Sequence, residues 1–306
     1  MRRILLYAGI LVLLSAFPGT VWVNAAGDKQ QPTAHQKAVN PEDFVGSETC
    51  QACHDELSTK FTQNPHSRLA MLHGGKGVTC ESCHGPGKEH VDGGGDVEKI
   101  FRFGHASAKA VDDKCLECHE GNHPNFERSG HGEAKVSCTG CHSVHTFESE
   151  TALLKVSQPK LCYTCHTDIK PAFAQPFHHK VDEGLISCSD CHNPHGTFKE
   201  KGLKSSVAGD AVCVKCHTET AGPFVYEHAP VRIEGCGSCH FPHGSPNPRL
   251  LTRSNVNTLC LQCHSASMNF NATGVPSFHN VANQYQACTV CHVQVHGSNT
   301  DSSYFK

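Results

Sequence analysis

The chain has 306 residues, a formal net charge of −3, 38% apolar residues, 27 glycines and 16 prolines. A weakly acidic net charge argues against nucleic acid as a partner. With so few apolar residues and so many chain-breaking ones, the polypeptide is poorly equipped to bury a core by itself.

Residues 1–25 are typical of a cleaved export signal. Two arginines precede an apolar run from Ile4 to Trp22, and small residues follow, so we expect cleavage after Ala25. The alternative is an uncleaved membrane anchor, but a serine and a Pro-Gly pair interrupt the run. Nothing later has the roughly 18 consecutive apolar residues of a spanning helix. We therefore predict a periplasmic destination and a flexible tail over residues 26–45.

Residues 46–306 contain ten copies of Cys-x-x-Cys-His, which use all 20 cysteines. Two thiols at this spacing can each bond one vinyl group of a porphyrin while the adjacent imidazole reaches the iron. A single Cys-x-x-Cys is also typical of zinc or redox pairs, and an even cysteine count in an exported chain is typical of disulfides. Ten copies, all followed by histidine, instead predict ten covalently attached haem c groups and an apoprotein that is largely disordered.

The predicted haem-attachment residues are Cys50, Cys53, Cys80, Cys83, Cys115, Cys118, Cys138, Cys141, Cys162, Cys165, Cys188, Cys191, Cys213, Cys216, Cys236, Cys239, Cys260, Cys263, Cys288 and Cys291. The predicted proximal iron ligands are His54, His84, His119, His142, His166, His192, His217, His240, His264 and His292. We number the motifs and their haems 1 to 10 in this order.

The motifs fall into five pairs with a period of about 50 residues, the kind of repeat that marks a stacked array. A glycine-rich stretch at Gly93–Gly95 lengthens the first pair and is expected to be a surface loop. We predict a multihaem cytochrome c fold of mostly coil with short α-helices and almost no β structure, forming an elongated haem wire of five two-haem repeats. If the chain divides into two pentahaem halves, they span about 46–175 and 176–306.

Fifteen histidines lie outside the motifs, and ten irons each need one further axial ligand. After loss of the signal only Met71 and Met268 remain as methionines, so bis-histidine ligation and low reduction potentials are expected. Two positional classes of distal histidine recur. One follows the second motif of each pair and cannot wrap around its own haem, so it should ligate a neighbouring one: His90, His145, His195, His243 and His296. The other precedes the second motif: His66, His131, His179, His228 and His279.

Two of these choices have an alternative. His178 adjoins His179, which we prefer because its spacing to the following motif resembles that of His279. His73 competes with His66, which we favour. The spare histidines are His35, His73, His105, His123 and His178.

The chain resembles the periplasmic decahaem cytochromes of the MtrA, DmsE and PioA family from about Phe44 to His296. Beyond the motifs, the likeness includes FVGSETC before the first haem, CHGPGKEHVDGGGD from Cys83, CSDCHNPHG from Cys188, GPFVYEHAPV from Gly222 and CHFPHGSPNPRLL from Cys239. The resemblance implies an electron conduit that lies inside a β-barrel porin of the outer membrane. It also implies a periplasmic or inner-membrane donor cytochrome and, at the other end, an extracellular multihaem cytochrome or reductase.

Pure electron transfer is thus the expected function, with both axial sites of each iron filled and no catalytic residue. A multihaem reductase of a small oxyanion would need one open iron, which none of the ten regular motifs indicates. A soluble periplasmic electron carrier is the third interpretation, and co-purification with a barrel protein would separate it from the conduit.

Overall fold

The computed structural model describes residues 40–72, 77–149, 151–204, 211–264 and 287–305. The predicted signal, residues 26–39 of the predicted tail, and His35, His73, Met268 and His279 lie outside the described residues. Residues Pro41–Lys306 form one compact unit. The boundary at residue 45 and the division into pentahaem halves stay predictions.

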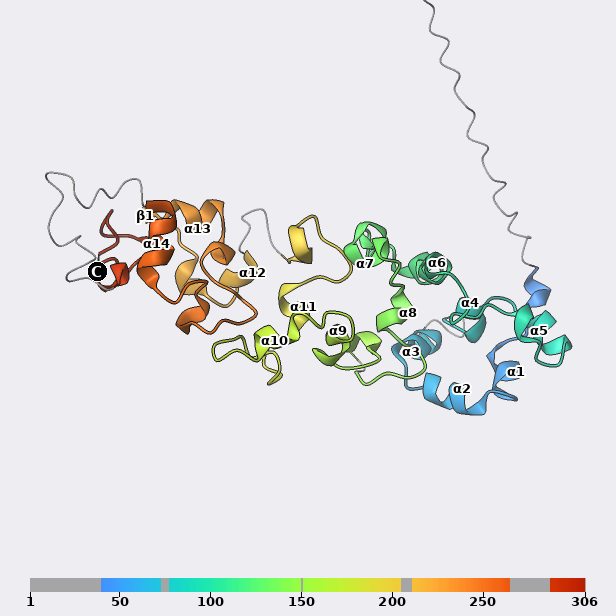
Figure 1. The fold of residues 1–306 in the computed structure, drawn as a ribbon. Helices are drawn as coiled ribbons and strands as arrows, with labels where there is room; N and C mark the ends of the chain where they lie inside the picture. The colour runs from blue at the N-terminus through green and yellow to red at the C-terminus, as the bar shows by residue number, and fades with distance from the viewer. Residues whose placement is uncertain (1–39, 73–76, 150, 205–210, 265–286, 306) are drawn as a thin grey trace, which may run out of the picture. The chain divides into compact units, whose positions relative to one another are not determined.

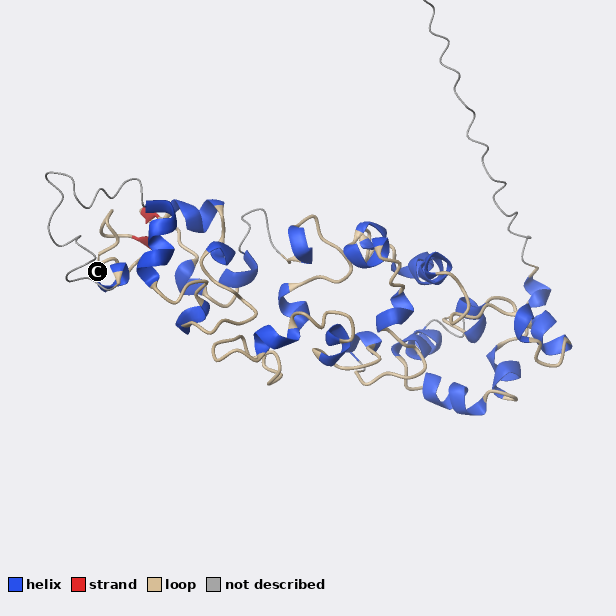
Figure 2. Ribbon diagram, viewed as in Figure 1, coloured by secondary structure: helices blue, strands red, loops and turns tan. Residues whose placement is uncertain are grey.

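Short helical turns joined by loops make up the fold (Figures 1 and 2). The α-helices are α1 (Ser47–Gln51), α2 (Asp55–Phe61), α3 (Pro65–Leu72), α4 (Cys80–His84), α5 (Lys88–Asp92), α6 (Ala108–His119), α7 (Gly130–Glu133), α8 (Cys138–Cys141), α9 (Lys160–Tyr163), α10 (Lys170–Phe173), α11 (Cys188–Cys191), α12 (Ala211–Val214), α13 (Ala229–Ile233) and α14 (Val256–His264). The strands are β1 (Tyr226–Glu227) and β2 (Gly297–Ser298), which pair antiparallel. The prediction of coil with short helices and almost no sheet is confirmed.

Several helices begin at a side-chain cap, and some end at a glycine or an extended residue. Thr79 caps α4 with a reciprocal Thr79–Ser82 capping box, and Gly85 ends that helix at φ 78°. Ser107 begins α6, the longest described helix, by accepting a hydrogen bond from Ala110 N. The motifs therefore lie on single turns rather than on long amphipathic faces.

The apolar core of the polypeptide is small and dispersed. Its buried hydrophobic side chains among the described residues are Val111, Phe126, Leu153, Phe173 and Val181. Large apolar side chains elsewhere stay exposed, with Leu185 at 78% and Phe198 at 88% of their full accessibility. No helix in the described part of the chain is long and apolar enough to cross a membrane. The polypeptide's own hydrophobic burial is thus modest, as its composition predicts.

Candidate haem sites

Each motif is wound into a turn that presents two thiols and an imidazole together. In seven motifs the histidine N–H donates to the carbonyl of the first cysteine at 2.9–3.0 Å: His54, His142, His166, His192, His217, His240 and His292. The other three motifs end α4, α6 and α14 at their histidines. None of the twenty cysteines, all of which lie among the described residues, forms a disulfide. A local i to i+4 bond therefore prepares the arrangement that haem attachment needs.

Within a pair, the two motifs lie against each other. Interactions join the first cysteines of both motifs in four pairs: Cys50 with Cys80, Cys115 with Cys138, Cys162 with Cys188, and Cys260 with Cys288. Burial, followed by the neighbouring Cys80 thiol, raises the pKa of Cys50 to about 11. The Cys162 thiol lowers the pKa of Cys188 to about 7 through a hydrogen bond.

A side chain three residues before the first motif reinforces this contact. Asp112 Oδ1 accepts from Cys138 N at 2.8 Å, Asn257 Oδ1 accepts from Cys288 N at 2.7 Å, and Ser47 Oγ accepts from Cys80 N at 3.4 Å. In the third pair Gln158, one residue earlier, bonds both the backbone N–H and the hydroxyl of Ser189. Our sequence analysis missed these residues, although an alignment of the repeats would have shown a polar side chain recurring at this position.

Successive pairs also lie close enough for their cysteines to interact electrostatically. Cys83 interacts with Cys115 and Cys118, Cys141 with Cys165, Cys191 with Cys213 and Cys216, and Cys239 with Cys260. Together with the contacts inside pairs, these join each motif to the next in chain order at eight of the nine steps. Cys213 and Cys236, at the remaining step, have interactions of their own.

Nine motif histidines each face one distal histidine across 5.9 to 6.3 Å between ring centres. The facing rings are His54 and His90, His84 and His145, His119 and His66, His142 and His195, His166 and His131, His192 and His243, His217 and His179, His240 and His296, and His264 and His228. The tenth motif histidine, His292, is described, but His279 is not. Every distal histidine that we predicted and that the structure describes thus faces a motif histidine.

This separation fits haem iron. A metal–nitrogen bond of about 2 Å on each side, plus roughly 1.1 Å from nitrogen to ring centre, puts two trans imidazoles about 6.2 Å apart. Two imidazoles in direct contact, or joined by a hydrogen bond, would have closer ring centres. Those of His123 and His195, for example, lie 4.0 Å apart. His123 also lies 6.3 Å from His119, but it follows that residue by four positions and cannot reach the opposite side of the same haem. The nine pairs therefore have the spacing of axial ligand pairs.

The second motif of every pair has its histidine Nδ1 bonded to a backbone carbonyl. The acceptors are Phe101 for His84, Ala152 for His142, Lys201 for His192, Arg249 for His240 and Ser303 for His292. A carbonyl can only accept, so Nδ1 carries the proton and Nε2 is left with its lone pair for a metal. Three of these acceptors have positive φ, 62° at Ala152 and 57° at both Lys201 and Arg249. In these three of the five cases a left-handed residue thus aims the carbonyl at its imidazole.

The distal histidines are partly buried, which favours the neutral imidazole that a metal requires. Burial lowers the pKa of His195 to about 4, with the nearby His123 and His142 adding to the effect. Burial is also the largest cause of the lowered pKa values of His66, His145, His228, His243 and His296. At neutral pH these side chains are therefore ready to ligate.

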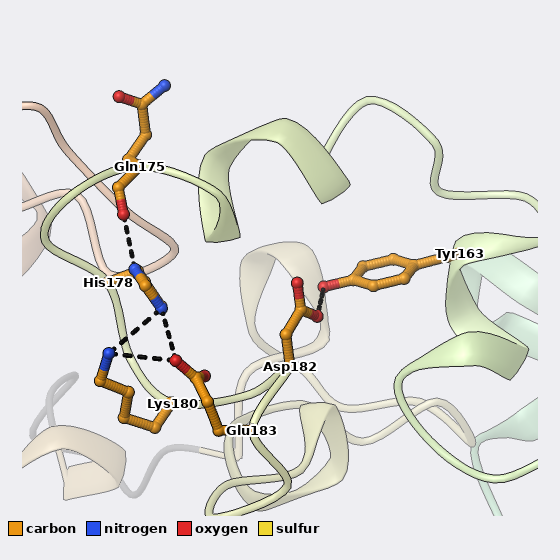
Figure 3. Close-up of polar contacts among 6 residues, drawn as sticks. All are labelled: Tyr163, Gln175, His178, Lys180, Asp182 and Glu183. Atoms are coloured by element: carbon orange, nitrogen blue, oxygen red, sulfur yellow. Dashed lines mark hydrogen bonds and ion pairs between the residues drawn. The ribbon is translucent and has the colours of Figure 1, made fainter.

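His178 and His179 differ in their contacts, and Figure 3 shows those of His178. His178 Nδ1 donates to Gln175 O at 2.6 Å, and its Nε2 lies 3.0 Å from Glu183 Oε1, which Lys180 also contacts. These hydrogen bonds lower the pKa of Glu183 to about 2. His178 thus has both ring nitrogens engaged within its loop. His179 instead points its ring at His217 and bonds the Pro242 carbonyl through Nδ1.

Comparison with known proteins agrees with these sites. The doubled CXXCH motif family matches residues 131–171, 178–222 and 228–269. The multiheme cytochrome MtrA of Shewanella baltica is 33% identical over 278 residues, covering 84% of this chain and 80% of that protein.

Two further relatives are more distant. The C-type polyheme cytochrome OmcC of Geobacter sulfurreducens is 29% identical over 54% of this chain but only 22% of its own length. The cytochrome c-type protein NrfB of Haemophilus influenzae is 26% identical over 51% of this chain and 80% of its own length. With its repeated motifs and its match along most of MtrA, the chain belongs to the MtrA family of multihaem c-type cytochromes, which bind haem c and transfer electrons rather than catalyse a reaction.

Proposed function

We propose that this chain holds ten haem c groups and conducts electrons between the periplasm and the cell exterior, across the outer membrane, inside a β-barrel porin. Each haem is attached through two motif cysteines and ligated by the motif histidine and one distal histidine. The observation that carries the proposal is the facing of nine motif histidines by nine distal histidines at one common separation.

The haem groups, when bound, supply one-electron exchange between ferrous and ferric iron. The chain's own residues would do the rest: the thiols would attach each haem, and the two histidines of each facing pair would ligate its iron and leave no position for substrate. Carbonyl acceptors hold the second-motif histidines in a single tautomer. Contacts between consecutive motifs, at eight of nine steps, keep neighbouring groups in chain order as a path for electrons requires.

The assignment extends to haem 10 by elimination. Nine distal histidines are used by nine motif histidines, and His279 is the predicted ligand that remains for His292. The first pair offers a precedent, because His90 faces His54 of its own pair. We therefore assign His279 to the iron of haem 10.

A reductase is disfavoured by the same observation, since a closed iron cannot bind an oxyanion. Low-temperature electron paramagnetic resonance (EPR) of the oxidised, haem-loaded protein, calibrated against total haem, tests this directly. We expect ten low-spin irons. A high-spin signal from one haem in ten would contradict full bis-histidine ligation and favour the reductase.

The conduit is supported by the likeness to MtrA along most of both chains. We expect the protein to be periplasmic and held at the outer membrane by its porin, with a periplasmic or inner-membrane cytochrome as donor and an extracellular multihaem cytochrome or reductase beyond. Affinity purification from detergent-solubilised outer membranes should recover a barrel protein in about equal amount. Recovery of the cytochrome alone, entirely in the periplasmic fraction, would favour the soluble carrier.

A further inference from the structure

The distal histidines that serve neighbouring pairs are linked to each other. At each boundary between two successive pairs of motifs, a distal histidine of the earlier pair serves the first haem of the later pair. A distal histidine of the later pair serves the second haem of the earlier pair. His131 Nδ1 donates to Pro194 O at 3.0 Å, and Pro194 directly precedes His195. His179 Nδ1 donates in the same way to Pro242 O, next to His243, and the backbone of Val295, next to His296, hydrogen-bonds the His228 ring. We call this link the boundary hydrogen bond.

At the first boundary the link is made differently. His66 and His145 occupy the equivalent places, and Val144 precedes His145. Here His66 Nδ1 bonds Asn64 Oδ1 at 2.9 Å, while Asn64 Nδ2 donates to Val144 O at 2.6 Å. Asn64 is 0% exposed, and its Oδ1 also accepts from His66 N at 2.8 Å. A side-chain amide is thus inserted where the other boundaries have a direct contact.

A glycine explains why the later boundaries allow a direct hydrogen bond and the first boundary does not. The residue after the backward-reaching histidine is Gly196, Gly244 or Gly297 at the later boundaries, and a Cβ on any of them would collide with the facing segment: with Asn125 O, Ala172 O or Phe224 respectively. The first boundary has Thr146 at this position. A residue with a branched side chain does not allow the same close approach, and the Asn64 amide spans the wider gap.

We propose that Asn64 is a positioning residue for the axial ligand of haem 3. It acts through His66: its amide oxygen fixes the Nδ1–H tautomer and the ring orientation, and its amide nitrogen ties that ligand to the chain holding the distal ligand of haem 2. The inference rests on the proposed ligation. At the other boundaries a backbone carbonyl does this work, so Asn64 is the one described boundary acceptor that a substitution can remove.

The expected effect has a definite sign. A hydrogen bond from Nδ1–H to an acceptor makes the imidazole a stronger donor to iron and stabilises the ferric state. Asn64→Leu keeps a similar volume and removes the acceptor, so the reduction potential of one haem should rise. The His66 and His119 planes cross at 86°, the most perpendicular pair of the nine, and a freed ring should change that angle and shift one low-spin EPR signal.

The experiment uses the haem-loaded full chain, with potentiometric titration and EPR calibrated to ten haems. Ser67→Ala is the matched control, since Ser67 is also buried and bonds only backbone carbonyls of Thr62 and Asn64. We expect Asn64→Leu to shift one haem in ten with all irons still low-spin, and the control to shift none. Unchanged potentials and spectra in Asn64→Leu, or equal shifts in both variants, would overturn the proposal.

Two further variants complete the test. Asn64→Asp offers a stronger acceptor and should move the same potential downward, which keeps the proposal testable if Asn64→Leu loses haem 3; an upward or absent shift would count against it. His66→Ala tests the ligation itself and should make one haem high-spin. If His66→Ala leaves ten low-spin irons, the proposed ligation fails, whereas a high-spin haem there with no effect at Asn64 refutes only the positioning role.

Discussion

Glu81 lies between the two cysteines of the second motif and is expected to hold the first haem pair together. Its carboxylate is only 4% exposed and accepts three backbone hydrogen bonds: Val45 N and Gly87 N on Oε1 at 2.9 and 2.8 Å, and Gly46 N on Oε2 at 2.9 Å. Val45 and Gly46 lead into α1, which carries Cys50, and Gly87 leads into α5, which carries His90. Loss of this carboxylate should therefore loosen both sides of the His54–His90 pair.

The magnitude follows from the number of donors left unpaired. A buried donor without its partner costs about 1–3 kcal/mol, so three donors partly rescued by water should cost roughly 3 kcal/mol in Glu81→Ala. Glu81→Gln keeps the two bonds on one oxygen and turns an amide N–H toward the third donor, which should cost about 1–2 kcal/mol. The predicted order of local stability is wild type, Gln variant, Ala variant.

Hydrogen exchange measured by mass spectrometry on peptides covering residues 44–54 and 84–92 reports this local opening, which a global melting curve of so large a haem protein would obscure. About 3 kcal/mol corresponds to exchange on the order of 100-fold faster. Glu56→Gln is the control, because Glu56 is exposed and pairs only with Lys60 on the same helix. If Glu81→Ala exchanges no faster than this control, the three hydrogen bonds do not anchor the pair and the reasoning is wrong.

Three other pairs of substitutions test separate features. His179→Ala should leave one haem in ten high-spin by EPR, whereas His178→Ala should leave all ten low-spin; the reverse outcome would exchange the two assignments. Gly244→Ala places a Cβ against Ala172 O and should lower local stability, measured by hydrogen exchange, by more than about 2 kcal/mol, while Gly104→Ala, with open space around it, should stay within about 0.5 kcal/mol. Lys201→Gly replaces a left-handed residue at φ 57° with glycine, which adopts this conformation without strain. The free energy of local opening, measured by hydrogen exchange, should be about 0.5–1 kcal/mol higher in Lys201→Gly than in Lys201→Ala. Equal exchange in the two variants would show that this turn stores no strain.

Much of the site was predictable because its cysteines and histidines recur in short sequence repeats. The motifs fix which thiols and which imidazole meet at one haem, since five consecutive residues form one turn. The two classes of distal histidine recur at fixed places, and each described member faces a motif histidine. The choice of His66 also used only its position before a motif, and in the structure the centre of its ring lies 5.9 Å from that of His119.

The partner of each distal histidine was not predictable in the same way. His66 and His119 are 53 positions apart, and His84 and His145 are 61 apart, so their meeting depends on how whole pairs pack. The carbonyl acceptors were hidden for another reason: a backbone oxygen has no sequence signature, and the left-handed turns at Ala152, Lys201 and Arg249 contain no obligatory glycine at those positions. Asn64 resembled any polar residue before a helix until its two contacts were known.

The pairing of histidines has a consequence for how the chain holds together. In each inner pair of motifs, one distal histidine faces a motif histidine of the preceding pair and the other faces a motif histidine of the following pair. Every boundary between successive pairs is therefore crossed by two facing histidine pairs, one in each direction. The first pair differs in that His90 faces His54 of its own pair. Under the proposed ligation, no inner pair can complete its own iron sites, and removing one pair would open an axial position on each neighbour. The repeat is therefore a unit of sequence but not a unit of stability, since ligation closes only when adjacent pairs are present together.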